Sequence, residues 1–306
     1  MTGSNRLSNT TLGILSMLLA VLMFSLNDVL GKWLASTFWV GQLLLLRGLA
    51  ALAVLSIFIF RAGWRVIFNV SRPKIMAIRM ALTAGEISSF YYAVKFMSLA
   101  DAITFWMAAP IYVAALSPML LGEKVGWRRW TAIGVGFLGV LIALGPAFNS
   151  QPSAVIVAIF GSLCFGLMMI SGRALRDSHD LALVFWPTVA SAVFGGVMVL
   201  YGLSGGASGW AAPGPTEYML LALLGIVALA AHYFTNKSLI LADASTVTPY
   251  QYMLLVWAMI FGWIFFGETP QASTMLGGAL IVISGLYIFF REQQLGRRAA
   301  EPALDK

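Results

Sequence analysis

Long hydrophobic runs follow one another along the whole chain, and short separators rich in glycine, proline or charged residues lie between them. Because an α-helix rises 1.5 Å per residue, about 20 residues of helix cross the hydrocarbon core of a bilayer. None of the runs alternates with a period of two, so the pattern predicts helices rather than strands. The predicted transmembrane helices are 11–34, 40–60, 74–98, 101–121, 127–145, 153–174, 181–203, 216–240, 244–266 and 271–290.

The basic residues between these runs predict the orientation. With residue 1 in the cytoplasm, almost all of the lysines and arginines between the runs fall on the cytoplasmic side, where such residues are enriched in membrane proteins. Omitting one helix would destroy this alternation. We therefore expect an all-α integral membrane protein with ten transmembrane helices and both termini in the cytoplasm. The first run has no convincing cleavage site and is expected to remain as a helix.

Composition supports a bilayer as the solvent. Hydrophobic residues make up 60% of the chain and charged residues 10%, whereas soluble domains carry about 25% charged residues. The net charge of +7 lies mainly between the hydrophobic runs, so membrane orientation explains it and nucleic-acid binding is not expected. Cys164, His179 and His232 show no metal-ligand spacing, so we expect no metal and no cofactor. The chain also has no G-x-x-x-x-G-K-[ST] motif, which argues against ATP as the direct energy source.

An internal repeat is the most specific pattern in the chain. Segments of the first half recur in the same order in the second half, about 142 positions later. The matched segments are Gly31–Leu34 with Gly172–Leu175, Tyr91 with Tyr233, Lys95 with Lys237, Ser98–Ala102 with Ile240–Ala244, and Gly122-Glu123 with Gly267-Glu268.

The repeat divides the chain into a cytoplasmic tail, two five-helix units and a second cytoplasmic tail. The predicted boundaries are 1–10, 11–147, 153–290 and 291–306. Because each unit has an odd number of helices, equivalent helices cross the membrane in opposite directions. Inverted repeats of this kind are typical of secondary transporters, whose binding site lies near the membrane midplane between the two units.

A basic residue ends the first helix of each half, Lys32 and Arg173, and in both halves an L-A-D-A segment leads into a helix that ends in G-E. With these features the chain resembles the drug/metabolite transporter superfamily in its ten-helix EamA-type branch, and in detail it is similar to bacterial aromatic amino-acid exporters. The resemblance covers roughly residues 10–290. It implies a carrier in the bacterial inner (cytoplasmic) membrane, a central cavity lined by the first, third, fourth, sixth, eighth and ninth helices, and peripheral fifth and tenth helices.

Glu86 is the one acid near the middle of a predicted helix. A charge there is costly and must face protein or water. Glu86 is therefore a candidate to bind a substrate amine or a coupled proton, and the alternative is a structural ion pair with Arg79 or Arg47. His232 is the repeat mate of Phe90, one turn from Glu86, and is a second candidate to bind a proton. Its alternative role is a hydrogen bond to a neighbouring helix.

Aromatic residues suggest the substrate. Trp106, Tyr92, Tyr250 and Tyr252 fall on the helices that the resemblance places around the cavity, and aromatic rings stack on flat apolar solutes. We treat them, with Phe90, as candidate substrate-binding residues, and packing in the core is the alternative for each. Asn27, in the outer half of the first helix, is a candidate for contacts with polar groups of the substrate.

Other polar residues favour structural roles. Asp28 precedes Lys32 by four residues, so an ordinary helical ion pair is expected between them, and a contact with polar groups of the substrate is the alternative for Asp28. Asp101 and Asp243 are expected to cap the helices that follow them, and the two glutamates of the G-E segments are expected to anchor loops.

Two prolines and several glycines mark special positions. Pro110 and Pro249 lie in corresponding helices of the two halves, and each removes a backbone hydrogen bond. Paired interruptions indicate a transport site, and a static kink is the alternative. Glycines in the fifth and tenth helices, such as Gly139 and Gly277, predict close helix packing or a dimer seam.

These features predict a secondary transporter, not an enzyme, that exports small metabolites by alternating access, with amino acids and above all aromatic ones as the leading substrates. The expected partners are this small-molecule substrate, the lipid bilayer and, as a candidate coupled ion, the proton. A monomer is expected rather than a homodimer.

A multidrug or nucleotide-sugar carrier of the same fold is an alternative, although nucleotide sugars call for more basic residues at mid-depth than Arg47 and Arg79. A membrane-embedded lipid-modifying enzyme is a second alternative, but no catalytic polar cluster is apparent.

Overall fold

The computed structural model describes residues 3–121, 126–150, 152–175, 177–204, 210–242 and 247–300. Its first half comprises α1 (Gly3–Thr37), α2 (Val40–Ala62), η1 (Trp64–Phe68), α3 (Pro73–Phe96), α4 (Leu99–Trp106), α5 (Ala109–Leu121) and α6 (Trp127–Ser150). Its second half comprises α7 (Pro152–Ala174), α8 (Asp180–Ser204), α9 (Pro215–Leu241), η2 (Thr248–Tyr252), α11 (Met253–Phe266) and α12 (Ala272–Ala300).

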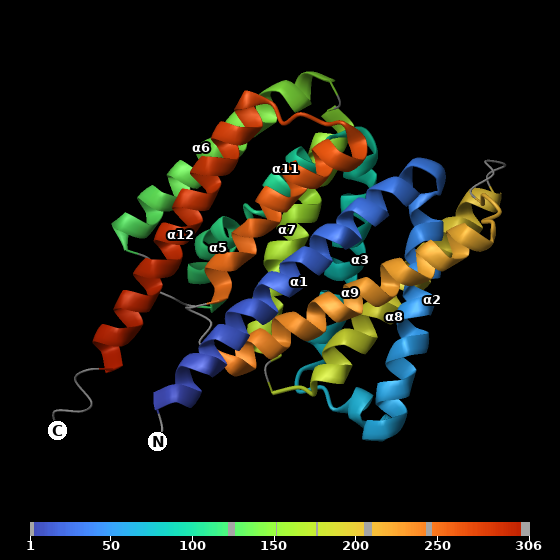
Figure 1. The fold of residues 1–306 in the computed structure, drawn as a ribbon, viewed down its shortest axis with the longest axis horizontal. Coiled ribbons are helices and arrows are strands. Elements are labelled where there is room, and N and C mark those ends of the chain that lie inside the picture. The colour runs from blue at the N-terminus through green and yellow to red at the C-terminus, as the bar shows by residue number, and fades with distance from the viewer. Residues whose placement is uncertain are drawn as a thin grey trace.

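These elements form ten membrane-crossing segments, because α4 and α5 together make one crossing and η2 and α11 make another (Figure 1). Eight of the described segments are long and apolar enough to span a bilayer by length and composition alone. The other two are α3 and α6. The lower hydropathy of α3 has a clear cause, since Arg79 and Glu86 lie within it. The all-α fold with ten helices is confirmed.

The strongest helix packing follows the inverted symmetry of the repeat. Helix α1 packs along α9, and α3 packs along α7. Since the repeat relates α1 to α7 and α3 to α9, these two pairs are equivalent to each other. The remaining strong pairs, α2 with α8 and α6 with α12, each join a helix to its own repeat mate. Each half therefore buries its apolar faces mainly against the other half.

The two halves are inverted relative to each other. Both termini lie at the same end of the bundle (Figure 1), which we name the terminal end, and we name the opposite end the distal end. The Leu99 N–H donates to Glu268 Oε2 (2.9 Å) at the distal end, whereas Ser238 Oγ donates to the Gly13 carbonyl (2.7 Å) near the terminal end. The first L-A-D-A segment thus begins at the distal end and the second at the terminal end, although Asp243 itself lies outside the described residues.

The fourth and ninth crossings are interrupted where the two prolines predicted it. Between α4 and α5 the helix breaks at Met107 and Ala108, just before Pro110. The ninth crossing begins as the 3₁₀ turn η2, which contains Pro249, and continues as α11. Met107 and Pro249 are 142 positions apart, so the two interruptions correspond under the repeat. Proline cannot donate a backbone hydrogen bond, which explains both breaks.

Glycines allow the peripheral helices α6 and α12 to touch backbone to backbone. A Cβ atom on Gly139 would lie 2.8 Å from the Gly277 carbonyl oxygen, so a larger residue does not fit. Small residues permit this close approach between membrane helices. These glycines therefore allow the two halves of one chain to pack closely. Close helix packing was one of the two predicted alternatives, and a dimer seam was the other.

Candidate functional site

Helix α3 carries an acidic side chain into the interior of the bundle. Trp106, the last residue of α4, donates its indole N–H to Glu86 Oε1 (2.7 Å). The Trp106 ring also packs closely against α7 at Gly161. A Cβ atom at this glycine would lie 2.8 Å from the ring, so no larger residue fits there. The end of α4 at Trp106 and the close packing at Gly161 thus position the indole N–H for its hydrogen bond to Glu86.

Aromatic rings extend from this hydrogen bond. Phe90 packs edge-to-face on Trp106 with ring centroids 5.1 Å apart and edge-to-face on Tyr91 at 5.8 Å. All three rings are buried. Glu86 is only half-buried, so its carboxylate lies at the edge of the aromatic group rather than inside it.

Charged residues of α1 and α2 complete the group. Arg47 donates through Nη1 to the Tyr91 hydroxyl, and its guanidinium lies 5.4 Å from the centroid of that ring. Asp28, Arg47 and Glu86 lie close enough to interact electrostatically, yet none of them forms an ion pair within 4 Å in the described part of the chain. We name Asp28, Arg47, Glu86, Tyr91 and Trp106 the interior polar cluster.

His232 faces this cluster from α9. Its ring contacts Phe24 of α1 edge-to-face, with centroids 5.1 Å apart, and it interacts electrostatically with Arg47 and Arg79. Its side chain is exposed on the side away from Phe24. It is therefore packed on one side and open on another, as a residue that meets a passing solute must be.

The remaining candidate residues lie elsewhere. Asn27 is buried and donates through Nδ2 to the Leu224 carbonyl (2.7 Å), which ties α1 to α9. Tyr250 packs against an apolar group that includes Met17 in the terminal half of α1. Tyr252 points its hydroxyl at Gly285 of the peripheral helix α12. The structure thus brings Glu86, Phe90 and Trp106 together, links His232 to this group through Arg47, and places Asn27, Tyr250 and Tyr252 apart from it.

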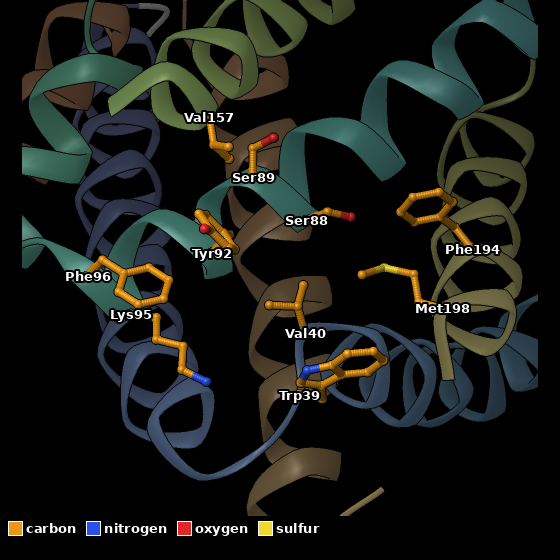
Figure 2. Close-up of a pocket in the computed structure, with 10 residues that line it drawn as sticks. All are labelled: Trp39, Val40, Ser88, Ser89, Tyr92, Lys95, Phe96, Val157, Phe194 and Met198. Carbon is orange, nitrogen blue, oxygen red and sulfur yellow. The ribbon is translucent and has the colours of Figure 1, made fainter. Parts of the chain in front are cut away.

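Tyr92 lines a separate pocket of about 420 Å³, which we name the lateral pocket (Figure 2). The pocket lies on the face of α3 that is turned towards α2, α7 and α8. Its lining residues are Trp39, Val40, Ser88, Ser89, Tyr92, Lys95, Phe96, Val157, Phe194 and Met198.

Among the described residues the predicted Asp28–Lys32 ion pair does not form, and neither does the Glu86–Arg79 pair that was the alternative for Glu86. Arg79 does not pair with Glu86, because its Nη1 donates to the Met168 carbonyl (2.8 Å) and to Ser171 Oγ (3.3 Å) of α7. Lys32 does not pair with Asp28 one turn away. Helix packing determines both outcomes. It brings α7 within hydrogen-bond distance of Arg79, and it brings the loops of the distal end within reach of Lys32.

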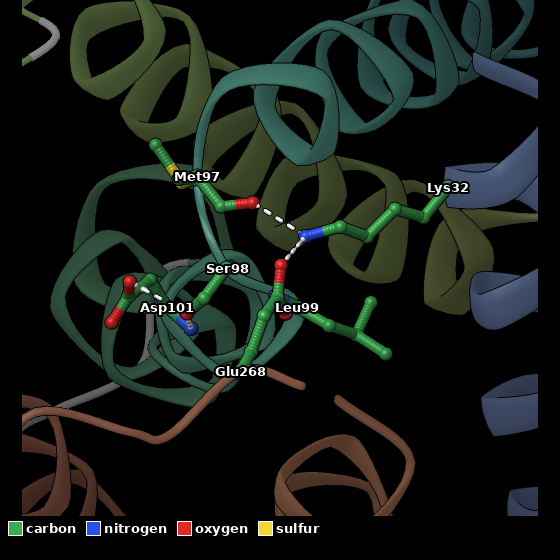
Figure 3. Close-up of polar contacts among 6 residues, drawn as sticks. All are labelled: Lys32, Met97, Ser98, Leu99, Asp101 and Glu268. Atoms are coloured by element: carbon green, nitrogen blue, oxygen red, sulfur yellow. Dashed lines mark hydrogen bonds and ion pairs between the residues drawn. The ribbon is translucent and has the colours of Figure 1, made fainter. Parts of the chain in front are cut away.

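Lys32 instead joins three segments at the distal end (Figure 3). Its ammonium donates to the Met97 carbonyl (2.7 Å) and forms an ion pair with Glu268. Glu268 also accepts the Leu99 amide. We name these four residues the distal closure. Glu268 is therefore a loop anchor as predicted, and its repeat mate Glu123 lies outside the described residues.

The N-cap of α4 is Ser98 rather than Asp101, which was the expected cap and instead lies in the first turn of the helix. Ser98 Oγ accepts the Asp101 N–H (3.1 Å) and donates back to the Asp101 carboxylate (2.6 Å), which is a reciprocal N-cap arrangement. Thr274 of α12 donates to the same carboxylate. Asp101 thus fixes both α4 and its contact with α12.

No group of three or more potential metal ligands occurs in the part of the chain that the structure describes. An interior cluster of opposite charges and aromatic rings, enclosed by two inverted halves, defines a membrane carrier for small molecules. The chain belongs to the EamA-like transporter family, whose sequence model matches residues 11–145 and 152–290.

Characterised relatives of this chain move different solutes. It is 25% identical to the S-adenosylmethionine uptake transporter of Rickettsia prowazekii, over 92% of this chain and 94% of the relative. It is 27% identical to the riboflavin transporter of Rhizobium johnstonii, over 96% of each chain, and 24% identical to the pseudopaline exporter of Pseudomonas aeruginosa, over 89% and 94%. A solved crystal structure superimposes with a TM-score of 0.60 over 95% of this chain and 98% of that chain, at 15% identity, which shows a shared fold alone.

Sequence reasoning left three residues of the interior polar cluster out of the candidate site. Asp28 was weighed as a substrate contact but favoured as the partner of Lys32, Tyr91 was not selected, and Arg47 was considered mainly as an ion-pair partner of Glu86. An arginine seven residues into the second crossing is the signal that was available, because such a charge needs partners from other helices.

Proposed function

We propose that this chain is a secondary carrier of the bacterial inner membrane that exports amino acids and related metabolites, with aromatic ones favoured. The observation that carries the proposal is the Glu86–Trp106 hydrogen bond beside the ring of Phe90. A carboxylate at the edge of aromatic rings can hold an ammonium group, and the rings attract both the cation and a flat apolar side chain.

The charges of the interior polar cluster match a zwitterion. Asp28 and Glu86 complement an ammonium group, and Arg47 complements a carboxylate. The relatives agree with a substrate of this kind, because S-adenosylmethionine is itself an α-amino acid with a flat base, and riboflavin has a flat ring system. Since uptake transporters and an exporter occur among the relatives, the direction must be measured rather than inherited.

Alternating access follows from the inverted repeats. In our proposal residues 11–147 and 153–290 are the two bodies that rock about the site, with both termini in the cytoplasm and the chain working as a monomer. The distal closure supports this mechanism, because it links Lys32 of the first half to Glu268 of the second half. Breaking that link opens the distal end, and an equivalent contact at the terminal end closes the other side.

Glu86 is the proposed coupling residue. It is the acid that accepts a hydrogen bond from Trp106 within the interior polar cluster, and a proton on it removes the charge that holds the substrate amine. Proton entry from the outside thus favours release of an exported amine and return of the empty carrier.

Transport into proteoliposomes tests the proposal. Labelled phenylalanine, tryptophan, threonine, S-adenosylmethionine and riboflavin are compared with and without a pH gradient, and efflux from intact cells gives the direction. We expect phenylalanine and tryptophan to cross faster than threonine and to respond to the gradient. The variant Glu86→Gln should lose the response to the gradient, whereas Glu217→Gln, which alters an acid in the first turn of α9, should retain it.

The result that refutes the substrate assignment is a rate for every amino acid equal to that of empty vesicles. Gradient-dependent transport that survives in Glu86→Gln would remove Glu86 from the coupling role.

A further inference from the structure

We propose that Arg79 binds the carboxylate of the substrate on the terminal side of the interior polar cluster, and that it makes the carrier prefer substrates with such a group. This inference rests on the proposed function and adds a specificity-determining residue to it. Arg79 lies in the first half of α3, seven residues before Glu86.

The guanidinium of Arg79 is only partly engaged. Its Nη1 makes the two hydrogen bonds to α7, to the Met168 carbonyl and the Ser171 hydroxyl. Its Nε is buried and has no hydrogen-bond partner among the described residues. The edge formed by Nε and Nη2 carries parallel N–H groups, and this fork matches the two oxygens of a carboxylate once movement of the two halves uncovers Nε.

The positive charge of Arg79 also has no counterion within 4 Å among the residues that the structure describes. Both of its partners on α7 are neutral, and the ion pair identified in the described ranges is that of Lys32 with Glu268. Arg47 differs, because it interacts with Glu86 and Asp28. An arginine that is half-buried within a membrane-crossing helix, as Arg79 is, is costly unless an anion joins it. A substrate carboxylate supplies that anion each time the carrier is loaded.

The position of Arg79 places it on the substrate path. Arg79, Glu86 and Phe90 are spaced by seven and four residues, so they share one stripe of α3. His232 of α9 interacts electrostatically with Arg79 and with Arg47 of the cluster. Seven residues of helix span about 10 Å, which exceeds the separation of the two charges in an α-amino acid. Arg79 therefore meets the carboxylate first, and the cluster around Glu86 receives the substrate next.

A pair of compounds that differ only in the carboxylate tests this role. Phenylalanine and phenylalaninamide are compared in proteoliposomes for the wild type, Arg79→Gln, Arg79→Lys and the control Arg61→Gln, which alters an exposed arginine in the last turn of α2. We expect Arg79→Gln to raise the KM for phenylalanine about tenfold or more while the KM for the amide changes less than twofold. Arg79→Lys retains the charge without the fork and should raise the KM for phenylalanine by a smaller factor. The control should match the wild type for both compounds.

A purely structural role predicts a different pattern. If Arg79 only ties α3 to α7, Arg79→Gln lowers transport of both compounds by the same factor, and that result overturns the inference. Should Arg79→Gln fail to fold, Arg79→Lys decides, because an unchanged preference for phenylalanine over its amide in that variant also overturns it. Transport of neither compound by the wild type would contradict the proposed function itself and remove the basis of this inference with it.

Discussion

Replacing Glu268 with glutamine removes the negative charge from the distal closure and keeps an oxygen that can accept the Leu99 amide. The side chains of Lys32 and Glu268 are 10% and 24% exposed, so the pair is largely shielded from solvent. A hydrogen bond between charged groups contributes about 1.5–3 kcal/mol, and breaking a fully buried pair costs about 3–5 kcal/mol. Because Lys32 keeps its bond to the Met97 carbonyl, we expect a loss of about 2 kcal/mol.

That loss acts on the equilibrium between closed and open distal ends. A change of about 2 kcal/mol alters the ratio of the two states by about 30-fold. The open state should therefore become about 30 times more populated in Glu268→Gln, provided that the distal closure exists only in the closed state.

Cysteine labelling measures this shift. The single cysteine is first removed with Cys164→Ala, and a reporter is introduced as Ala100→Cys, since Ala100 is 4% exposed next to the distal closure. A charged maleimide then labels the reporter only when the distal end opens, at a rate proportional to the open fraction. The labelling rate should rise about 30-fold with Glu268→Gln and stay unchanged with the control Glu217→Gln. Equal labelling rates in Glu268→Gln and its parent would refute the reasoning.

Three further changes test the packing around the site. Trp106→Phe removes the hydrogen bond to Glu86 and keeps a ring, so kcat/KM for an amine-bearing substrate should fall about tenfold, and an unchanged value would contradict a role for that bond. Gly161→Ala places a methyl group against the Trp106 ring and should lower stability by about 1–3 kcal/mol, measured as a lower Tm in detergent. Gly285→Ala meets the Tyr252 hydroxyl and should lower the Tm as well, and Tyr252→Phe in the same chain should restore part of the loss; no restoration would show that the clash lies elsewhere.

The ten crossings and their inversion could be predicted from the sequence because they depend on local properties. The length of a hydrophobic run determines whether a helix can span the bilayer. The matched segments reveal the inversion once each half holds an odd number of helices. Pro110 and Pro249 likewise marked the two interruptions, since proline disrupts a helix wherever it lies within one.

The candidate site could be predicted only in part. Glu86 and Trp106 were both identified, because a charge at mid-helix is visible in the chain and the family resemblance placed the helix of Trp106 around the cavity. Their hydrogen bond was not, since it depends on how α3 and α4 rotate about their axes when they pack. The packing of η2 likewise decides that Tyr252 points towards α12 rather than towards Glu86.

The partners of the ionic groups were decided by the tertiary structure. Helical spacing favoured Asp28 as the partner of Lys32, but the side chain reaches Glu268, 236 positions away in the chain. An ion pair forms between the groups that packing brings together with the best geometry and the least exposure to solvent. The sequence alone thus determined which segments cross the membrane as helices and that the two halves cross it in opposite directions. The packing of those helices decided which charged groups form ion pairs.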